Sequence, residues 1–406
     1  MTLLPPAPRS ASRTEFVLLC LFAIVLPLVE APKNISLGLF VLAWFVHSAR
    51  QRQWGGAISL LDLSLGAMLA SALLSGFATA FFKPITKELG DIVSYLVLGW
   101  CVSRTALSSR QTLTLALCLI AATLAGLAEG YWTLWQVPKR IALQLNSVGH
   151  VNHSALYAVG IVMVALACYL PQRSALSKRQ QLGAALTGLV LLASMLAFGS
   201  RGALLTLAFA AAAFVWLHHR VRPLPWLRLL LVAAIVGTPV LYLKRDMLEK
   251  TLINFSAGGS VTAYRAETAR TATETWRHAP LLGVGPGNLP MIDHAQIAAW
   301  LGERGEPFNP ARYTNRLHAH SLYFNTLAER GALGLGTLIA FGALWSCLLV
   351  RQRPSAAAAA EHWQRWGIGL GGFAIVFIGG LFNTTFHHEH GMLAMLCLGM
   401  QKDIRT

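Results

Sequence analysis

The sequence predicts an all-α membrane protein with about twelve transmembrane helices and one large segment outside the membrane. Of its 406 residues, 55% are hydrophobic and only 12% are charged, whereas about a quarter of the residues in an ordinary soluble domain are charged. The apolar residues form blocks of about 15 to 25, the length that a helix needs to cross roughly 30 Å of hydrocarbon. A soluble chain of this size would alternate apolar and polar residues, so a polytopic membrane protein is the fold class that we expect.

Twelve apolar blocks define the expected spans. They cover residues 16–30, 34–49, 57–76, 90–104, 112–132, 153–170, 182–198, 203–218, 227–243, 321–349, 366–382 and 386–400. Between the first two blocks we expect a turn at Ala31–Asn34. Because Pro32 and further spans follow the first block directly, we expect that block to be a retained helix and not a cleaved signal peptide. The chain then divides into nine spans over residues 1–243, a loop over 244–320 and three spans over 321–406.

The placement of Lys and Arg predicts the orientation in the membrane. With a cytoplasmic N-terminus, 17 of these residues lie on the cytoplasmic side and 6 in the short loops opposite, as the positive-inside rule requires. Both termini are then cytoplasmic, and the long segment 244–317 lies outside the cytoplasm. Residues 262–278 of this segment contain good helix formers and neither Gly nor Pro, so we expect a helix there. A Gly- and Pro-rich turn, Pro280–Asn288, follows it.

Several other functions are disfavoured by the same sequence. The net charge of +16 is scattered and lacks interleaved aromatic residues, so we expect no nucleic-acid partner. The six cysteines lie in or beside apolar blocks without a CxxC pair, which is typical of small hydrophobic residues. Gly283–Gly287 lacks the Lys and Ser/Thr of a phosphate-binding loop. The stretch His387–His390 lacks a standard ligand spacing, so we expect no metal site there.

Three basic positions are candidates for chemistry. Arg201 lies between two apolar blocks, where a charge usually faces protein, water or a partner, although an arginine at a helix end that reaches toward water would give the same pattern. Arg265 and Arg270 lie on the expected helix 262–278, where a solvated face with local ion pairs is the simpler interpretation. His320 stands where the loop re-enters the membrane, and its titration range suits proton transfer near neutral pH. A plain interfacial histidine is the alternative.

Stretches in this region resemble the signature of the O-antigen ligase and polymerase superfamily. They are Pro280–Asn288 (PLLGVGPGN), His320-Ser321 and Leu327–Gly334 (LAERGALG), preceded by Gly199–Gly202 (GSRG) and the helix Arg265–Trp276 in the order that the family shows. Ser321 replaces the Asn that is commoner after the histidine. The resemblance covers about residues 199–336, and the hydropathy of the remaining chain agrees with it.

The resemblance implies a glycosyltransferase of the bacterial inner membrane whose active site faces the periplasm. An O-antigen ligase would transfer O-antigen from undecaprenyl diphosphate to a sugar hydroxyl of lipid A–core, with inversion and without a metal, a cofactor or a nucleotide sugar. Those two substrates and membrane lipids would be its partners. Arginine binds phosphate oxygens bidentately, and a histidine can accept the hydroxyl proton. We therefore expect Arg201 and Arg265 to hold the diphosphate and His320 to act as general base.

Weaker candidates and alternative functions stay open at this point. Lys87, His318 and Arg270 are further candidates for contacts with substrate. An O-antigen polymerase or a protein O-oligosaccharyltransferase would use the same kind of donor. A lipid or glycan transporter would also be polytopic, but it should show two related halves with interrupted helices, and the sequence has no such symmetry.

Overall fold

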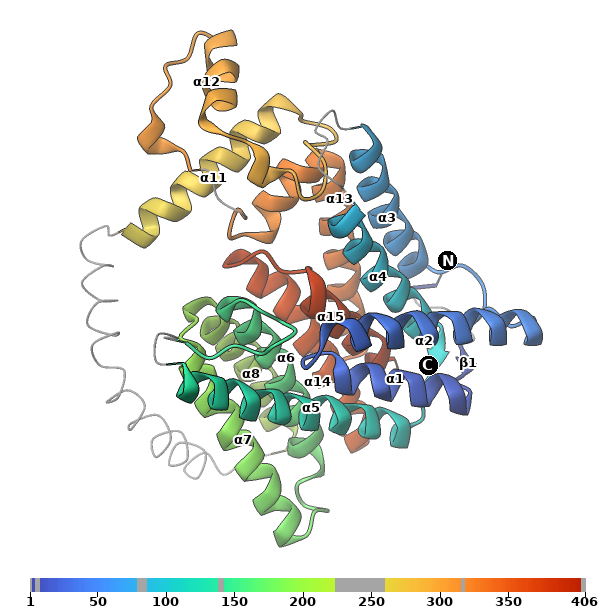
Figure 1. The fold of residues 1–406 in the computed structure, drawn as a ribbon. Helices are drawn as coiled ribbons and strands as arrows, with labels where there is room; N and C mark the ends of the chain where they lie inside the picture. Colours follow the sequence, from blue (N-terminus) through green and yellow to red (C-terminus); the bar gives the residue numbers. More distant parts are fainter. Residues whose placement is uncertain are drawn as a thin grey trace.

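The computed structural model describes residues 2–3, 8–78, 86–137, 142–222, 260–314 and 318–402. These residues contain thirteen α-helices and two strands of two residues each, which confirms the all-α class (Figure 1). The helices are α1 (Arg13–Val25), α2 (Glu30–Gln51), α3 (Leu60–Ala78), α4 (Thr86–Ser103), α5 (Ser109–Gln136), α6 (Val151–Tyr169), α7 (Lys178–Phe198), α8 (Arg201–Val221), α11 (Ser260–His278), α12 (His294–Glu303), α13 (Leu322–Arg351), α14 (Ala360–Phe373) and α15 (His388–Gln401). The strands, β1 (Arg9–Ser10) and β2 (Thr105–Ala106), pair in parallel.

Six described helices have the length and apolar character to cross a membrane, so the chain is an integral membrane protein. They are α3, α5, α6 with the 3₁₀ turn that extends it to Gln172, α7, α8 and α13. Some of the remaining helices are too short: the 13 residues of α1 extend about 20 Å at 1.5 Å per residue, less than the hydrocarbon thickness. The block at 227–243 lies outside the described residues, and the count of twelve spans stays a prediction.

The turn between the first two blocks lies earlier than the sequence suggested. We expected it at Ala31–Asn34, but α2 begins at Glu30, and the break falls at residues 26–29. Pro32 therefore stands in the first turn of α2. A proline is tolerated there because the first amide groups of a helix have no intrahelical acceptor to lose.

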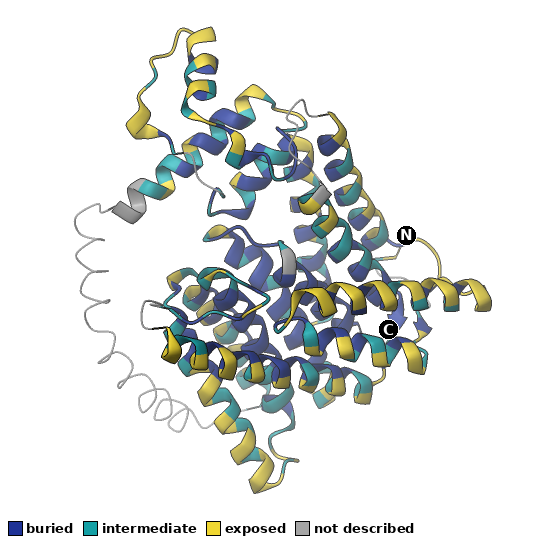
Figure 2. Cartoon of the chain, in the orientation of Figure 1, coloured by how far each residue is buried: buried dark blue, intermediate teal, exposed yellow. Residues whose placement is uncertain are grey.

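The expected helix at 262–278 is confirmed as α11, and it lies with α12 at one end of the molecule (Figure 1). Figure 2 shows that α12 carries exposed, intermediate and buried residues, whereas the helices at the centre of the molecule are largely buried. One of these is α6, whose most apolar stretch is 78% buried inside the protein. The α11–α12 unit therefore covers one end of a helical bundle.

The two ends of the described chain meet at the end of α4. The backbone N–H of Arg9 donates to the carbonyl of Arg104 at 3.2 Å, and Lys402 Nζ donates to the carbonyl of Ser103 at 3.5 Å. Both ends therefore lie at one face of the molecule. The 18 residues of α4 extend about 27 Å from there, so its other end, with Lys87 and Glu88, lies at the opposite face.

Close helix packing leads to irregular backbone after α14. A Cβ added to Gly372 would lie 2.6 Å from the Cβ of Cys397 on α15, so α14 and α15 approach each other closely, as small residues allow in membrane proteins. After α14 the chain forms a π-helical stretch, Ala374–Ile378, and then a 3₁₀ turn, Gly379–Leu381. This change of helix type ends at Phe382, which contacts the candidate site.

Candidate active site

The Gly-rich turn at Pro280–Asn288 is joined to a kink in α13. Inside α13, Gly331 has φ 62° and ψ −164°, which breaks the helix. The carbonyls of Ala328 and Glu329 then accept hydrogen bonds from the backbone N–H groups of Val284 (3.0 Å) and Gly285 (2.8 Å). The kink thus provides the acceptors that hold the turn.

Glycine is required where these two segments cross. A Cβ at Gly283 would lie 2.4 Å from the backbone of Glu329, and a Cβ at Gly331 would lie 2.3 Å from the carbonyl oxygen of Leu281. Both residues also have positive φ, which side chains other than glycine rarely adopt. The two stretches that resemble the family signature are therefore one interlocked structure, and it fixes the start of α13.

His320 stands immediately before α13, in a backbone conformation that is uncommon for a residue with a side chain. Its φ is 49°, in the left-handed region, which costs on the order of 1–3 kcal/mol and persists only where the surrounding structure holds it. Ser321 is the N-cap of α13, and His320 lies one residue earlier. The start of α13 therefore fixes the backbone position of His320.

The His320 ring is half-buried and faces α11. Its Nε2 lies 3.1 Å from the hydroxyl of Tyr264, so an O–H group fits within hydrogen-bond distance of this nitrogen. Burial lowers the pKa of His320 below its usual value, and the positive charges of Arg265 and His150 lower it further. A hydrogen bond with Asn383 acts in the opposite direction. His320 is therefore held in its neutral form, which can accept a proton.

Arg201 and Arg265 meet at Phe382. Arg201 is the first residue of α8, after a turn in which Gly199 has φ 71°. A Cβ at its neighbour Gly202 would lie 2.6 Å from the Cβ of Phe382, so the start of α8 packs against this residue. From α11, Arg265 Nη2 donates to the carbonyl of Phe382 at 3.2 Å. The loop before α15 thus joins the two arginines.

The two guanidinium groups interact unfavourably with each other. Partial desolvation lowers the pKa of Arg265, and the charge of Arg201 lowers it further. Both side chains are exposed. In the part of the chain that the structure describes, neither forms an ion pair with a carboxylate. An anion between them would relieve the repulsion, and a phosphate group has the oxygens that two guanidinium groups bind.

The structure brings three of the six sequence candidates together and places the other three elsewhere. Arg201, Arg265 and His320 surround Phe382 and Asn383. Lys87 is exposed at the start of α4, and Arg270 is exposed on α11, five residues after Arg265. Five residues correspond to about 140° around a helix, so Arg270 faces another direction.

His318 contacts different residues from His320. Its ring is half-buried, with centroid distances of 6.4 Å to His153 and 5.5 Å to His387. The two histidines of the re-entry segment therefore have separate environments.

Sequence reasoning missed Tyr264, Phe382 and Asn383. Phe382 contributes a backbone carbonyl, which leaves no trace in the sequence. Asn383 is 118 residues or more from the arginines along the chain, so no local pattern connects them. Tyr264 precedes Arg265 on the helix, and its position beside a candidate was the one available signal.

Comparison with known proteins finds a similarity to one family. Residues 184–339 match the family model described as O-Antigen ligase. No curated protein matches the chain. The matched segment contains Arg201, Arg265 and His320 but ends before Phe382, and it begins after Lys87. Residues 184–339 of this membrane protein are therefore similar to the O-antigen ligase family.

Proposed function

We propose that this protein is an O-antigen ligase of the bacterial inner membrane. It transfers O-antigen from undecaprenyl diphosphate to a sugar hydroxyl of lipid A–core at the periplasmic face. The observation that supports this most strongly is the convergence of Arg201, Arg265 and His320 from three separate elements. Two cations that have no carboxylate partner among the described residues, beside one neutral base, are suited to a reaction in which a diphosphate leaves and a hydroxyl attacks.

Arg201 and Arg265 hold the diphosphate of the donor. When the bond between the anomeric carbon and the phosphate oxygen breaks, negative charge grows on the leaving group. Positive groups placed where that charge develops lower the barrier. Arg265 is positioned by the carbonyl of Phe382, which leaves its other nitrogens available for phosphate oxygens.

His320 accepts the proton of the attacking hydroxyl. The acceptor oxygen forms the new bond to the anomeric carbon from the side opposite the diphosphate, so the configuration inverts. The proton of the acceptor hydroxyl passes to Nε2 of His320. In the structure, the hydroxyl of Tyr264 lies 3.1 Å from this nitrogen. Because its pKa is lowered, the His320 ring is neutral near neutral pH. This nitrogen can then accept a proton, as a general base requires.

The residues of the proposed site lie at the face opposite the joined chain ends. If the termini are cytoplasmic, as the Lys and Arg distribution predicts, this face is periplasmic. A cysteine introduced at Asn309, with the native cysteines replaced, is then expected to react with a membrane-impermeant thiol reagent in intact spheroplasts. Labelling only after lysis would contradict the orientation.

Deletion of the gene followed by lipopolysaccharide gel analysis tests the ligase assignment. Loss of a ligase leaves bare lipid A–core and long polymer on undecaprenyl diphosphate. Loss of a polymerase leaves core that carries one repeat unit, which would contradict ligation and favour the alternative reaction. Complementation with the wild-type gene, but not with the Arg265→Ala variant, should restore the polymer-bearing core.

A further inference from the structure

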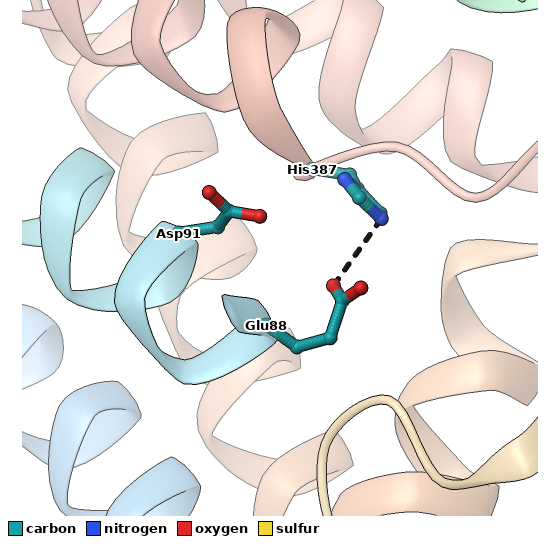
Figure 3. Close-up of side chains that lie close together, drawn as sticks. All are labelled: Glu88, Asp91 and His387. Carbon is teal, nitrogen blue, oxygen red and sulfur yellow. Dashed lines mark ion pairs between the residues drawn. The ribbon is translucent and has the colours of Figure 1, made fainter. Parts of the chain in front are cut away.

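Beside the proposed transfer site lies a cluster of three groups that bind metals. Figure 3 shows Glu88 and Asp91 on α4 facing His387, in the loop before α15. His387 Nε2 lies 3.4 Å from Glu88 Oε2, and one ligand atom from each of the three residues lies within 4.8 Å of the others. Gly287 makes room for Glu88, because a Cβ there would lie 2.4 Å from Glu88 Cγ.

The cluster borders a small polar cavity of about 40 Å³. On the same measure one water molecule needs about 10–15 Å³, so there is room for an ion with a water. Two buried polar atoms that line this cavity, Thr384 Oγ1 and Arg330 Nη1, have no hydrogen-bond partner among the described residues. Because buried polar groups rarely lack partners, we expect the cavity to contain water or another hydrogen-bonding partner.

The charges around the cavity favour a cation. Glu88, Asp91 and Glu329 contribute three carboxylates to its lining, and Arg330 contributes one guanidinium. Two of these carboxylates, Glu88 and Asp91, belong to the cluster itself, and both attract a cation that binds between them.

The ligand types in the cluster favour one kind of cation. An N–H···O hydrogen bond is usually 2.7–3.2 Å long, so the 3.4 Å between His387 and Glu88 is longer than a good one. Two ligand atoms on one tetrahedral zinc ion, each about 2.0–2.1 Å from it, lie about 3.3 Å apart. Magnesium prefers six oxygens in an octahedron, whereas zinc accepts imidazole and carboxylate ligands together.

We propose that Glu88, Asp91 and His387 bind one Zn²⁺ ion. The hydroxyl of Thr384 or a water in the cavity completes the coordination. The ion joins the start of α4 to the loop that leads from Phe382 to α15, and so it stabilises the wall of the transfer site. It takes no part in the transfer reaction, in which the arginines and His320 supply the charge and the base.

Zinc binding to purified protein tests this proposal. The protein is placed in nanodiscs with any polyhistidine tag removed, stripped with a chelator and dialysed against Zn²⁺, and the bound metal is counted by mass spectrometry. The wild type is expected to bind one zinc ion per chain, and His387→Ala and Asp91→Asn should bind it at least ten-fold more weakly. His294→Ala, on α12, is the control with unchanged binding, since His294 contacts Tyr313 and Phe308 instead.

Asp91→Asn keeps the shape of the side chain, so it carries the test if His387→Ala fails to fold. Zinc should raise the melting temperature of the wild type and not that of Asp91→Asn, because an ion that binds the native state stabilises it. Equal zinc binding by the wild type and both variants would overturn the proposal. Tighter binding of Mg²⁺ or Mn²⁺ than of Zn²⁺ would overturn the choice of ion, and loss of glycan transfer after chelation would overturn its separation from the reaction.

Discussion

Arginines at the two faces of this protein have opposite surroundings. At the face of the chain ends, Arg104 is 4% exposed, and its Nε donates to Asp62 Oδ1 at 2.8 Å. Its Nη1 donates to the carbonyls of Trp54 (2.5 Å) and Gly56 (3.1 Å). At the other face, Arg265 is exposed, has one hydrogen bond in the described chain and lies near a second positive charge.

The difference is the one that we expect between arginines that stabilise the fold and arginines that bind a ligand. Charged groups in a membrane protein are costly unless they are paired or face a functional cavity. Arg104 is fully paired, so its role is to hold α3, α4 and the α2–α3 loop together. Arg201 and Arg265 interact with each other unfavourably, which a protein retains only where another gain compensates. We infer that this gain is the binding of an anionic donor.

The largest expected effect comes from the base beside these arginines. His320→Ala should lower the rate of transfer at saturating donor by roughly 10²–10⁴-fold, because a positioned general base contributes about that much. His318→Ala should have a milder effect, since its ring contacts His153 and His387 instead. Product formation from lipid-linked donor and lipid A–core measures both. A His320→Ala enzyme with a normal rate would mean that the base lies elsewhere.

Stability measurements on matched variants can break the comparison between the two faces. Arg104→Ala removes one partner of a buried ion pair, so it should cost about 3–5 kcal/mol of unfolding free energy. Arg265→Ala removes an exposed side chain and should change the unfolding free energy by no more than about 0.5 kcal/mol. Unfolding in mixed micelles gives both values. Similar losses for the two variants would show that Arg265 also stabilises the fold.

The dependence of transfer on pH should reflect the environment of His320. Because the folded protein lowers the pKa of His320 below the usual 6.5, the neutral base is the main form at pH 6.5, and the rate should fall only at lower pH. The same shift makes the folded state more stable above pH 6.5 and less stable as the pH falls through the folded pKa.

Asn383→Ala removes a hydrogen bond that raises the pKa of His320, so the acid limb of this variant's pH profile should lie at lower pH than that of the wild type. An acid limb at higher pH in this variant would contradict the assignment.

The smallest effect is expected for Lys87. It is exposed at the start of α4, on the face of the proposed site, and it contributes one point charge to the surroundings of an anionic donor. Lys87→Ala should reduce transfer several-fold without a change in protein level. Lys178→Ala, at the start of α7, serves as the control with normal activity. Equal activity of the two variants would exclude Lys87 from the site.

Local patterns in the sequence predicted the parts of this structure that depend on local residues. The run without Gly or Pro predicted α11, and the Gly-rich stretch predicted the turn after it. The start of α2 was misplaced because a proline signals a break equally well in a turn and in the first turn of a helix. No local pattern predicted the kink at Gly331. The hydrogen bonds that accompany this kink come from residues 284 and 285, which are distant in the sequence.

Contacts between distant segments explain why the site was predicted only in part. Arg201, Arg265 and His320 became candidates because their residue types suit the chemistry and because they lie in stretches that resemble a known family. Asn383 and the carbonyl of Phe382 act through their place in the fold. Arg330 was overlooked inside an apolar block, although a charge in such a block indicates function by itself. We expected no metal site at residues 387–390 because spacing rules compare residues on one segment, whereas the carboxylates that face His387 come from α4.

Donor affinity tests the central claim, that two arginines without carboxylate partners hold the diphosphate. Binding of the undecaprenyl diphosphate-linked donor should be measured for the wild type and for Arg201→Ala, Arg265→Ala, Arg265→Lys and His320→Ala in nanodiscs. The account predicts at least ten-fold weaker binding for both alanine variants and a clear loss for Arg265→Lys, because lysine lacks the bidentate fork. His320→Ala should bind the donor as the wild type does. Wild-type affinity in Arg201→Ala and Arg265→Ala would contradict the claim.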